Sequence, residues 1–338
     1  MKIGNREIGP WLPPIVVAEV GANHGGSLER AMDCIDAAKA VGADAVKFQA
    51  YTPDTITLDC NRPEFMIKDG PWKGRRLYDL YKSAHTPFEW FQKIAARANE
   101  VGITWFASVF DPSSVDELER LGCPAYKIAS FEIVDLPLIR YVVKTGKPLI
   151  ISSGMASEDD IDAVADLLNE EGAPFANQIV LACVSEYPAK PESYCLKRAL
   201  TLNDGISDHT LGNEVAIAAT ALGAQMIEKH FKLDYNLDTE DAPFSLVPSQ
   251  FRQMVESVKT TWAAVYGKPS DIPSPQRQMR RSLFAVADIR KGEAFTHENV
   301  RSIRPGDGLP PDEISRIIGK VAVRDIERGE PMAWGMVG

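Results

Sequence analysis

The sequence alternates, eight times in succession, between a short apolar run of strand length and an amphipathic run of helix length. Such alternation favours a parallel sheet whose strands are connected by crossover helices. Eight units match a closed (β/α)8 barrel, or TIM barrel, whereas the alternative, an open doubly wound sheet, usually needs fewer strands. The expected strands are residues 15–20, 44–49, 103–108, 125–130, 148–153, 178–185, 205–209 and 225–230. The expected helices are residues 27–41, 86–101, 112–121, 135–145, 157–171, 194–202, 212–223 and 248–265.

The alternating pattern stops after residue 266, which predicts a second, smaller domain. Residues 267–281 (GKPSDIPSPQRQMRR) are rich in proline, serine and basic residues and are typical of a linker. Residues 282–338 contain short strand-like runs, Gly-Glu and Pro-Gly turns and one helix-like segment near 311–318. We expect a barrel domain at 1–266 and a small, mostly β domain at 282–338, which is only marginally stable by itself and therefore packs on a barrel.

Composition excludes several classes of protein. The net charge of −10 argues against a broad nucleic-acid surface, so an anionic substrate would need a local basic pocket. The start, MKIGNREIGPWLPP, lacks the apolar run of a signal peptide, and no run is long enough to cross a bilayer. The odd number and scattered positions of the cysteines favour reduced thiols and a cytoplasmic protein. They are Cys34, Cys60, Cys123, Cys183 and Cys195.

Two of the expected strands, in consecutive units, end in a histidine. His209 ends GISDH and His230 ends QMIEKH, so both imidazoles are expected side by side at the carboxyl edge of the sheet. Two neighbouring imidazoles predict a divalent metal site whose remaining positions are left to water and substrate. We expect Asp208 to orient one of the imidazoles. The alternative is a structural role for each histidine.

Charged side chains come late in the expected strands and on one face. Lys47 and Gln49 share a face of their strand, and Glu228 shares a face with His230. This pattern is typical of the mouth of a barrel, where polar side chains point inward. Glu19, at the end of the first strand, is a candidate general acid or base; the alternative is an ion pair with Lys47.

Two lysines of these strands predict an anion pocket. A lysine inside a barrel is costly unless a negative charge compensates it, and Lys47 and Lys127 are both expected to point into the mouth. With nearby serine hydroxyls they suit a phosphate or carboxylate group of a substrate. The alternative is pairing with Glu19, Glu132 and Glu228. The serines are Ser130, Ser153, Ser185 and Ser207.

Several loops carry weaker signals. Residues 50–85 form an insert long enough to predict a lid or wall, although the cluster around Trp72 and Arg75 also suits a packed loop or a dimer contact. His24 lies in the Gly-rich loop GANHGG and is a candidate for contact with substrate. Asp241 lies in the loop TEDAPFS and is expected to face the site, and Arg304 precedes a tight turn.

Long motifs resemble the sialic acid synthase family, and the tail RRSLFAVADIRKGEAFTHENVRSIRPGDG resembles the antifreeze-like (SAF) domain of that family. The segments GPWKGRRLYDLYKSAHTP and TEDAPFSL resemble its pseudaminic acid synthase branch. The sialic and legionaminic branches more usually have Gly-Pro-Asp-His and then Ala-Ser-Leu at the second place. Val184 and Val247 depart from the threonine and glutamate that are frequent in the branch. The motifs are AEVGANHGG, GADAVKFQAYTPDTIT, PAYKIASFEI, ISSGMA, GISDHTLG and IEKHF.

The resemblance implies a transferase that condenses phosphoenolpyruvate with an N-acetylated amino sugar and releases phosphate. In the pseudaminic branch the sugar is 2,4-diacetamido-2,4,6-trideoxy-β-L-altropyranose, and the nonulosonic acid product serves flagellin glycosylation or cell-surface polysaccharide. N-acetylneuraminic or legionaminic acid synthesis is the nearest alternative. A metal-dependent aldolase and a non-enzymatic sugar- or ice-binding protein are more distant ones. The resemblance also implies a domain-swapped homodimer, with no nucleic-acid or membrane partner.

Residue roles follow from the same motifs. His209 and His230 would bind manganese, magnesium or cobalt, and Glu19 would be the acid/base residue. Arg304 would enter the site of the partner subunit. The residues expected at the sugar are Gln49, Tyr187 and the catalytic Asp241. The residues expected to hold phosphoenolpyruvate are the catalytic Lys47 and Lys127 together with Ser130, Ser153, Ser185 and Ser207.

Overall fold

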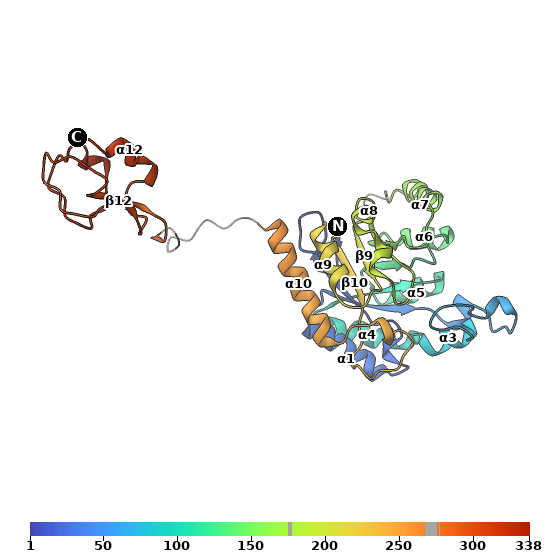
Figure 1. Ribbon diagram of the computed structural model, residues 1–338. Helices are drawn as coiled ribbons and strands as arrows, with labels where there is room; N and C mark the ends of the chain where they lie inside the picture. The colour runs from blue at the N-terminus through green and yellow to red at the C-terminus, as the bar shows by residue number, and fades with distance from the viewer. Residues whose placement is uncertain (175–177, 268–275, 277) are drawn as a thin grey trace. The chain divides into compact units, whose positions relative to one another are not determined.

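The computed structural model describes residues 1–174, 178–267, 276 and 278–338 of the chain. The chain divides into two compact units, Met1–Gly267 and Lys268–Gly338, which Figure 1 colours from blue to orange and from orange to red. Residues 268–275 and 277, which make up much of the expected linker, lie outside the described residues. Among the described residues, no helix combines the length and the apolar character that crossing a membrane requires.

The first unit is the expected barrel. Eight parallel strands close in the order β10-β3-β4-β5-β6-β7-β8-β9, which confirms the predicted (β/α)8 architecture. Each lies within two residues of an expected strand or inside it. The strands are β3 (Ile15–Glu19), β4 (Ala45–Ala50), β5 (Thr104–Val109), β6 (Tyr126–Ile128), β7 (Leu149–Ser152), β8 (Ile179–Cys183), β9 (Gly205–Asp208) and β10 (Met226–His230).

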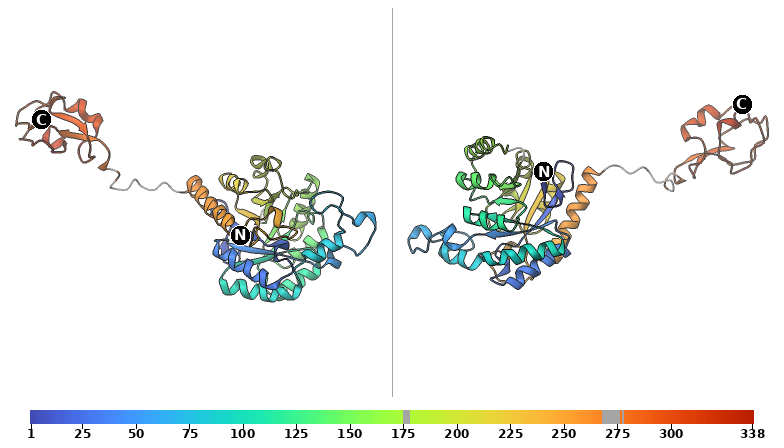
Figure 2. Two further views of the ribbon diagram at one scale, coloured as in Figure 1. Left: turned by 60° about the horizontal axis from the view of Figure 1, so that its bottom comes forward. Right: turned by 180° about the vertical axis from the view of Figure 1, so that it is seen from behind.

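Helices surround this barrel, as Figures 1 and 2 show. Several begin at a side chain that accepts a hydrogen bond from a backbone N–H of the first turn, as Ser27, Asp111 and Ser157 do. The helices that follow the eight strands are α1 (Leu28–Ala40), α4 (Phe88–Val101), α5 (Pro112–Arg120), α6 (Leu136–Val143), α7 (Glu158–Glu170), α8 (Leu196–Ala199), α9 (Glu214–Ala221) and α10 (Pro248–Tyr266).

One helix is much shorter than predicted. The sequence predicts a helix over 194–202, but α8 has a single turn and is preceded by the 3-10 helix η4 (Pro191–Tyr194). Cys195 lies between them with φ of 43°, in the left-handed region. A non-glycine residue in this region cannot continue a right-handed helix, so the segment breaks into two short turns.

The loops contain further short elements. The insert after β4 holds α2 (Pro53–Ile56), η2 (Pro63–Phe65) and α3 (Leu77–Ala84), and it projects from one side of the barrel in Figures 1 and 2. The loops after β3 and β10 contain η1 (Gly21–His24) and η5 (Ala242–Phe244). An N-terminal hairpin, which was not predicted, pairs β1 (Lys2–Ile3) with β2 (Arg6–Glu7).

The barrel strands have one face toward the helices and one toward the barrel interior. The outward face is mostly apolar: Ala18 and Val46 are register partners on β3 and β4, and both are fully buried. The inward face is apolar in the amino-terminal part of the strands, where Val17 is the register partner of Ala45. It is polar at the carboxyl ends, where Glu19 of β3 is the register partner of Lys47 of β4. The fold therefore gathers the charged inward side chains at one end, as expected for a TIM barrel.

The second unit has a core of its own. Its antiparallel strands are β11 (Ser282–Ala285) and β12 (Val300–Ile303). The expected helix near 311–318 is present as η6 (Pro311–Glu313) followed by α12 (Ile314–Ile317), and η7 (Trp334–Met336) lies near the end. Much of the remaining pairing consists of isolated bridges, such as Ile289 with Ile326, so this unit has less regular strand than the sequence suggests.

Candidate active site

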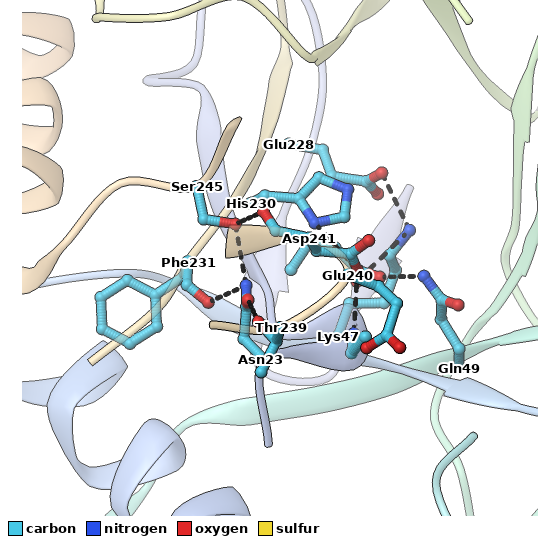
Figure 3. A network of polar contacts seen from close by, with 12 residues as sticks. Asn23, Lys47, Gln49, Glu228, His230, Phe231, Thr239, Glu240, Asp241 and Ser245 are labelled. Carbon is cyan, nitrogen blue, oxygen red and sulfur yellow. Dashed lines mark hydrogen bonds and ion pairs between the residues drawn. The ribbon is translucent and has the colours of Figure 1, made fainter. Parts of the chain in front are cut away.

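The charged core of the site is a three-member ion cluster at the mouth of the barrel. The Lys47 ammonium lies 2.8 Å from Glu228 Oε1 and 3.5 Å from Glu19 Oε2, and all three side chains are at least 95% buried. Gln49 Nε2 donates to Glu19 Oε1 at 2.8 Å. Figure 3 shows Lys47 and Gln49 of β4 and Glu228 of β10 close together; β3, which carries Glu19, lies between these two strands in the barrel. The inward direction predicted for Lys47 and Gln49 is confirmed.

The two carboxylates that share Lys47 differ in their protonation. Burial raises the pKa of Glu19 to about 7, against the opposing effect of Lys47. Burial also disfavours the ionised form of Glu228, but Lys47 and Lys127 outweigh it and lower the pKa to about 2. Glu228 is therefore the permanent counter-ion of the lysines, whereas Glu19 exchanges a proton near neutral pH. Two neighbouring carboxyls whose pKa values are pushed apart are typical of an acid/base site.

The two histidines lie together, as predicted. Their ring centroids are 5.5 Å apart, and both side chains are buried. His209 Nδ1 lies 2.8 Å from the carbonyl oxygen of Val184. Because a carbonyl oxygen only accepts, Nδ1 of His209 carries a proton and Nε2 is the nitrogen left for a ligand.

His230 also presents a nitrogen without a hydrogen bond. Its Nδ1 is buried without a partner and lies 3.6 Å from Asp241 Oδ2. Burial, reinforced by His209, lowers the pKa of His230 well below its usual range, so the ring is neutral. A neutral imidazole with an unused nitrogen is the form that binds a metal ion.

The donor set fits a divalent cation bound in an open site. Within the part of the chain that the structure describes, no three metal-ligating side chains are grouped closely enough to hold a cation by themselves. The two imidazoles would leave the remaining positions to water or substrate. The charges also favour a cation: near neutral pH Glu228 and Asp241 offset Lys47 and Lys127, so the protein groups alone leave little positive charge for an anionic substrate.

The second lysine lies on the opposite side of the mouth from the histidine strands. Lys127 Nζ donates to Ser152 Oγ at 2.5 Å and to the carbonyl oxygen of Ile128 at 3.1 Å. Burial lowers its pKa to about 8, so most of the ammonium form persists at neutral pH. Its hydrogen bonds go to neutral oxygens, and the Glu228 carboxylate, which pairs directly with Lys47, offsets its charge only from a distance.

Three of the four predicted serines face the mouth. Ser130 Oγ and Ser185 Oγ are hydrogen-bonded to each other at 2.8 Å, although Ser130 lies beyond the end of β6. Ser207 Oγ donates to Glu228 Oε1 at 2.9 Å. Ser207 therefore joins the cluster of Lys47 through Glu228, whereas Ser130 and Ser185 form a pair next to Cys183.

The prediction for Ser153 is corrected by the structure. Its hydroxyl donates to Asn203 Oδ1 at 2.8 Å, away from Lys127. The reason is strand alternation: successive side chains point to opposite faces, and it is Ser152 that contacts Lys127. Ser152 takes the place in the cluster that the sequence assigned to its neighbour.

The expectation that Asp208 orients an imidazole is wrong. Its carboxylate instead binds Lys229 and Thr210 on the outward face.

The expectation that His24 contacts substrate is also wrong. His24 is buried, and both ring nitrogens are hydrogen-bonded, one to the N–H of Gly26 at 3.2 Å and one to Thr86 Oγ1 at 3.1 Å. Its pKa falls to about 4 through burial, so it is a neutral structural residue rather than a contact for substrate.

Aromatic rings form a wall beside the histidines. Tyr187 lies 4.4 Å from His209 and 5.0 Å from Phe244, measured between ring centroids. Trp72, from the insert at 50–85, lies 5.7 Å from Tyr187. The insert thus forms part of the wall of the site, as one of the sequence interpretations proposed. We call Trp72, Tyr187 and Phe244 the aromatic wall.

Glu240 ties this insert to the loop after β10. Its carboxylate accepts from Arg75 Nη1 at 3.1 Å and from Ser83 Oγ at 2.6 Å, and its carbonyl oxygen accepts from Trp72 Nε1 at 3.3 Å. The next residue is Asp241, so the contact holds the aromatic wall beside the site.

Asp241 is held by the loop after β3. The N–H of Ala22 donates to its Oδ2 at 2.8 Å, and burial raises the pKa of Asp241 to about 6 in spite of this bond. Asn23 crosslinks the same loops by donating to Ser245 Oγ and to the carbonyl oxygen of Phe231, as Figure 3 shows. The predicted inward position of Asp241 is confirmed.

Sequence reasoning missed several residues of the site or assigned them a lesser role. Glu228 was only an alternative partner for the lysines, although its position two residues before His230 on one strand face already placed it in the mouth. Ser152 and Phe244 carried no signal of their own. Cys183 Sγ lies 3.8 Å from His209 Nδ1, and Glu132 is a half-buried residue whose carboxyl pKa is raised by burial to about 7.

Arg304 lies in the second unit and is exposed, before a cis peptide bond to Pro305. The expectation that it enters the site of a partner subunit stays a prediction.

Comparison with known proteins identifies the family of the chain. A sequence profile described as the NeuB family matches residues 34–269, and one described as the SAF domain matches residues 280–338. Pseudaminic acid synthase of Campylobacter jejuni is 41% identical over 344 residues, covering 99% of both proteins. Pseudaminic acid synthase of Helicobacter pylori is 39% identical, covering 95% of this chain and 97% of the relative. N,N'-diacetyllegionaminic acid synthase of Legionella pneumophila is 33% identical, covering 98% and 96%.

Solved structures give the same assignment. The spore coat polysaccharide biosynthesis protein SpsE of Bacillus subtilis is 32% identical and superposes with a TM-score of 0.66, covering 100% of this chain and 99% of that one. N-acetylneuraminic acid synthetase of Leptospira borgpetersenii is 30% identical with a TM-score of 0.70, covering 82% and 93%. These matches confirm the resemblance to the sialic acid synthases, and the chain belongs to the NeuB family of enzymes and carries a SAF domain.

Proposed function

We propose that this protein is a pseudaminic acid synthase. It condenses phosphoenolpyruvate with 2,4-diacetamido-2,4,6-trideoxy-β-L-altropyranose and water, giving a nonulosonic acid and phosphate. The observation that carries the proposal is the cluster of paired imidazoles, ammonium groups and carboxyls at the barrel mouth, in a chain about 40% identical to two pseudaminic acid synthases over nearly its full length. The alternative is legionaminic or N-acetylneuraminic acid synthesis, supported by the 33% identity to a legionaminic relative.

His209 and His230 would hold the divalent cation, which is manganese, magnesium or cobalt. When bound, such a cation polarises the aldehyde oxygen of the open-chain sugar, an effect worth several kcal/mol. The unpaired nitrogens of the two rings support this assignment. Asp241 Oδ2 lies 3.6 Å from His230 Nδ1. Its carboxyl group would therefore contact the sugar beside the cation.

Phosphoenolpyruvate occupies the side of the mouth near Lys127. The ammonium of Lys127 and the hydroxyls of Ser130, Ser152 and Ser185 bind its phosphate and carboxylate, and Lys47 adds charge from the centre. An anion gains most from such donors because they are buried and already oriented. The neutral acceptors around Lys127 support this placement, since its hydrogen bonds use no carboxylate that an incoming anion would have to displace.

The reaction forms one carbon–carbon bond and one carbon–oxygen bond, the latter to water, and it breaks the carbon–oxygen bond to phosphate. The terminal enol carbon of phosphoenolpyruvate attacks the aldehyde carbon, and the cationic carbon that develops beside it takes up water. The resulting tetrahedral intermediate loses phosphate. Glu19 moves a proton in sugar opening or in water addition. Its pKa of about 7 suits both giving and taking a proton.

We predict that Glu19→Gln binds phosphoenolpyruvate as the wild type does but turns over at least about a hundredfold more slowly, because general acid/base catalysis is typically worth this much. Glutamine keeps the shape of Glu19 and an acceptor for Gln49. Phosphoenolpyruvate affinity is measured by titration calorimetry, and turnover by phosphate release. The matched control is Glu158→Gln, a change in the exposed first turn of α7. Wild-type kcat in Glu19→Gln would remove Glu19 from the mechanism.

The sugar lies against the aromatic wall and contacts Gln49, Tyr187 and Asp241. Two acetamido methyl groups and a deoxygenated C6 make this sugar more apolar than N-acetylmannosamine. Aromatic side chains suit a ligand with apolar and polar ends. Trp72 is placed by the insert, one of the two segments whose sequence resembles the pseudaminic branch. We therefore assign part of the sugar preference to Trp72.

We predict that Trp72→Ala raises KM for the diacetamido sugar about tenfold, since loss of an aromatic contact costs on the order of 1 kcal/mol beyond buried area. KM for phosphoenolpyruvate stays near the wild-type value, because Trp72 lies on the histidine side of the mouth. Trp72→Phe should restore much of the sugar KM. The control is Trp11→Ala, since Trp11 is 77% exposed near Tyr266. Equal rises of both KM values would contradict the assignment.

The choice between sugars is tested directly by phosphate release. The purified protein is assayed with phosphoenolpyruvate, manganese and each of three sugars: the altro-configured diacetamido sugar and those that give legionaminic and N-acetylneuraminic acid. We expect the altro sugar to give the highest kcat/KM. A higher value with either of the others would favour that alternative. Consumption of the sugar without phosphoenolpyruvate, and without phosphate release, would point to an aldolase or lyase.

The remaining assignments concern the assembly and its setting. The protein acts as a homodimer in the cytoplasm, in which the SAF domain of one subunit caps the barrel of the other and Arg304 meets the sugar substituents there. The nonulosonic acid serves flagellin glycosylation or a cell-surface polysaccharide. These assignments rest on the resemblance of the full chain to the family, including the SAF domain at 280–338.

A further inference from the structure

A buried ion pair lies directly behind the two histidines. Lys229 Nζ is 2.8 Å from Asp208 Oδ2, and both side chains are fully buried. The two residues are register partners on β10 and β9, and they face outward, toward the helices. Each is the strand neighbour of a histidine: Asp208 precedes His209, and Lys229 precedes His230.

Further hydrogen bonds make this pair a crosslink of the backbone. Asp208 Oδ1 accepts from the N–H of Thr210 at 2.9 Å and from its Oγ1 at 2.7 Å. Lys229 Nζ also donates to the carbonyl oxygen of Thr210 at 2.5 Å. The backbone on both sides of His209 is therefore tied to the residue before His230.

Strand pairing alone does not require such a pair. At the corresponding outward position of β3 and β4, the register partners are Ala18 and Val46, which hold the strands together with apolar side chains. A buried ion pair is often no more stabilising than apolar side chains of similar volume, because both charges lose their hydration. The expected benefit is thus not stability but a fixed geometry.

We propose that Asp208 and Lys229 are positioning residues that set the spacing and direction of the two imidazoles for a divalent cation. This inference rests on the proposed metal site. The pair contacts neither ring, and it acts through the backbone of β9, β10 and the turn at Thr210. Groups hydrogen-bonded directly to metal ligands typically change metal affinity 10- to 100-fold when they are replaced, and we take this range as the expectation for the backbone crosslink.

The test is a neutral double variant, Asp208→Asn with Lys229→Met, in the full-length protein. Asparagine keeps an acceptor for Thr210, and methionine keeps the length of lysine, so no single charge is left buried. Binding of Mn²⁺ alone is measured by the loss of the free-ion signal in electron paramagnetic resonance, without substrates. We expect an unfolding temperature near that of the wild type and an affinity for Mn²⁺ about 10- to 100-fold lower.

A surface pair serves as the matched control. Asp36→Asn with Arg97→Met neutralises the partly exposed bridge between α1 and α4 and should leave Mn²⁺ binding unchanged. If the double variant does not fold, Asp208→Asn alone, which keeps the Lys229 contact as a weaker hydrogen bond, is titrated in its place. A folded variant that binds Mn²⁺ as the wild type does would overturn the inference alone. Failure of the wild type to bind Mn²⁺ would instead overturn the proposed metal site, and the inference with it.

Discussion

Replacing His230 with alanine is expected to reduce phosphate release by about a thousandfold or more while the barrel stays folded, because Lewis-acid polarisation is worth several kcal/mol and each 1.4 kcal/mol is tenfold in rate. The side chain makes no hydrogen bond through its buried Nδ1. Among the described residues, its removal therefore costs no hydrogen bond at that atom and only the 3.6 Å contact with Asp241 Oδ2. Turnover is measured by phosphate release, and folding by the unfolding temperature.

Removal of the metal is expected to reproduce this loss. Treatment of the wild type with a chelator should abolish turnover, and manganese, magnesium or cobalt should restore it. Addition of metal to His230→Ala should restore little, because one of two protein ligands is missing. His85→Ala, a change on the insert where the ring contacts Lys82, is the control and should behave as the wild type. Near-normal turnover of chelated wild-type enzyme would contradict the metal assignment.

Lys47→Met is expected to abolish turnover and, unlike His230→Ala, to destabilise the barrel by about 3–5 kcal/mol, the typical cost of leaving a buried charge unpaired. Lys47 lies between Glu19 and Glu228, and both carboxyls lose their nearest positive charge. The pKa of Glu19 should rise further, since Lys47 is the main group that holds it down. The free energy of unfolding is measured by denaturant titration.

A second substitution separates the two effects of Lys47→Met. Adding Glu228→Gln removes the carboxylate that lies closest to Lys47, so it should recover part of the lost stability but none of the turnover. Lys39→Met, whose ammonium binds the carbonyl oxygen of Gly102 on the surface, should change neither quantity appreciably. Full stability of Lys47→Met would show that the cluster does not depend on its lysine.

The barrel was predictable because its signal is local and repeated. Each strand reads as a short apolar run and each helix as an amphipathic one, and eight repeats leave few architectures that bury all of them. The helix predicted at 194–202 is broken by the left-handed backbone at Cys195, which the amphipathic pattern of the segment does not indicate.

The centre of the site was also accessible from the sequence. Lys47, Glu228 and His230 lie on strand faces that period-2 alternation identifies, and the end of each strand marks the edge of the mouth. A charged side chain is costly in a barrel interior unless an opposite charge pairs with it, so the inward-facing charged side chains are expected to lie together at the mouth. This is why His209, His230, Glu19 and Lys47 could be grouped without coordinates.

The tertiary structure was required to decide which of two neighbouring residues near a strand end faces the site. In the strand with Ser152 and Ser153, no charge marks the inward face, so alternation alone could not tell which hydroxyl meets Lys127. Asp208 was expected to orient an imidazole because it precedes His209 in the sequence. In the structure it instead forms an ion pair with its register partner Lys229 on the outward face.

The sequence by itself determined the architecture, the family and the chemical types gathered at the mouth, because periodicity and strand ends are encoded locally. The tertiary structure alone decided which side chains make contact: that Glu240 anchors Trp72 beside Tyr187, and that Asp208 and Lys229 form a crosslink behind the imidazoles. Those contacts join segments far apart in the chain. Their geometry depends on register and on loop paths, which no local pattern specifies.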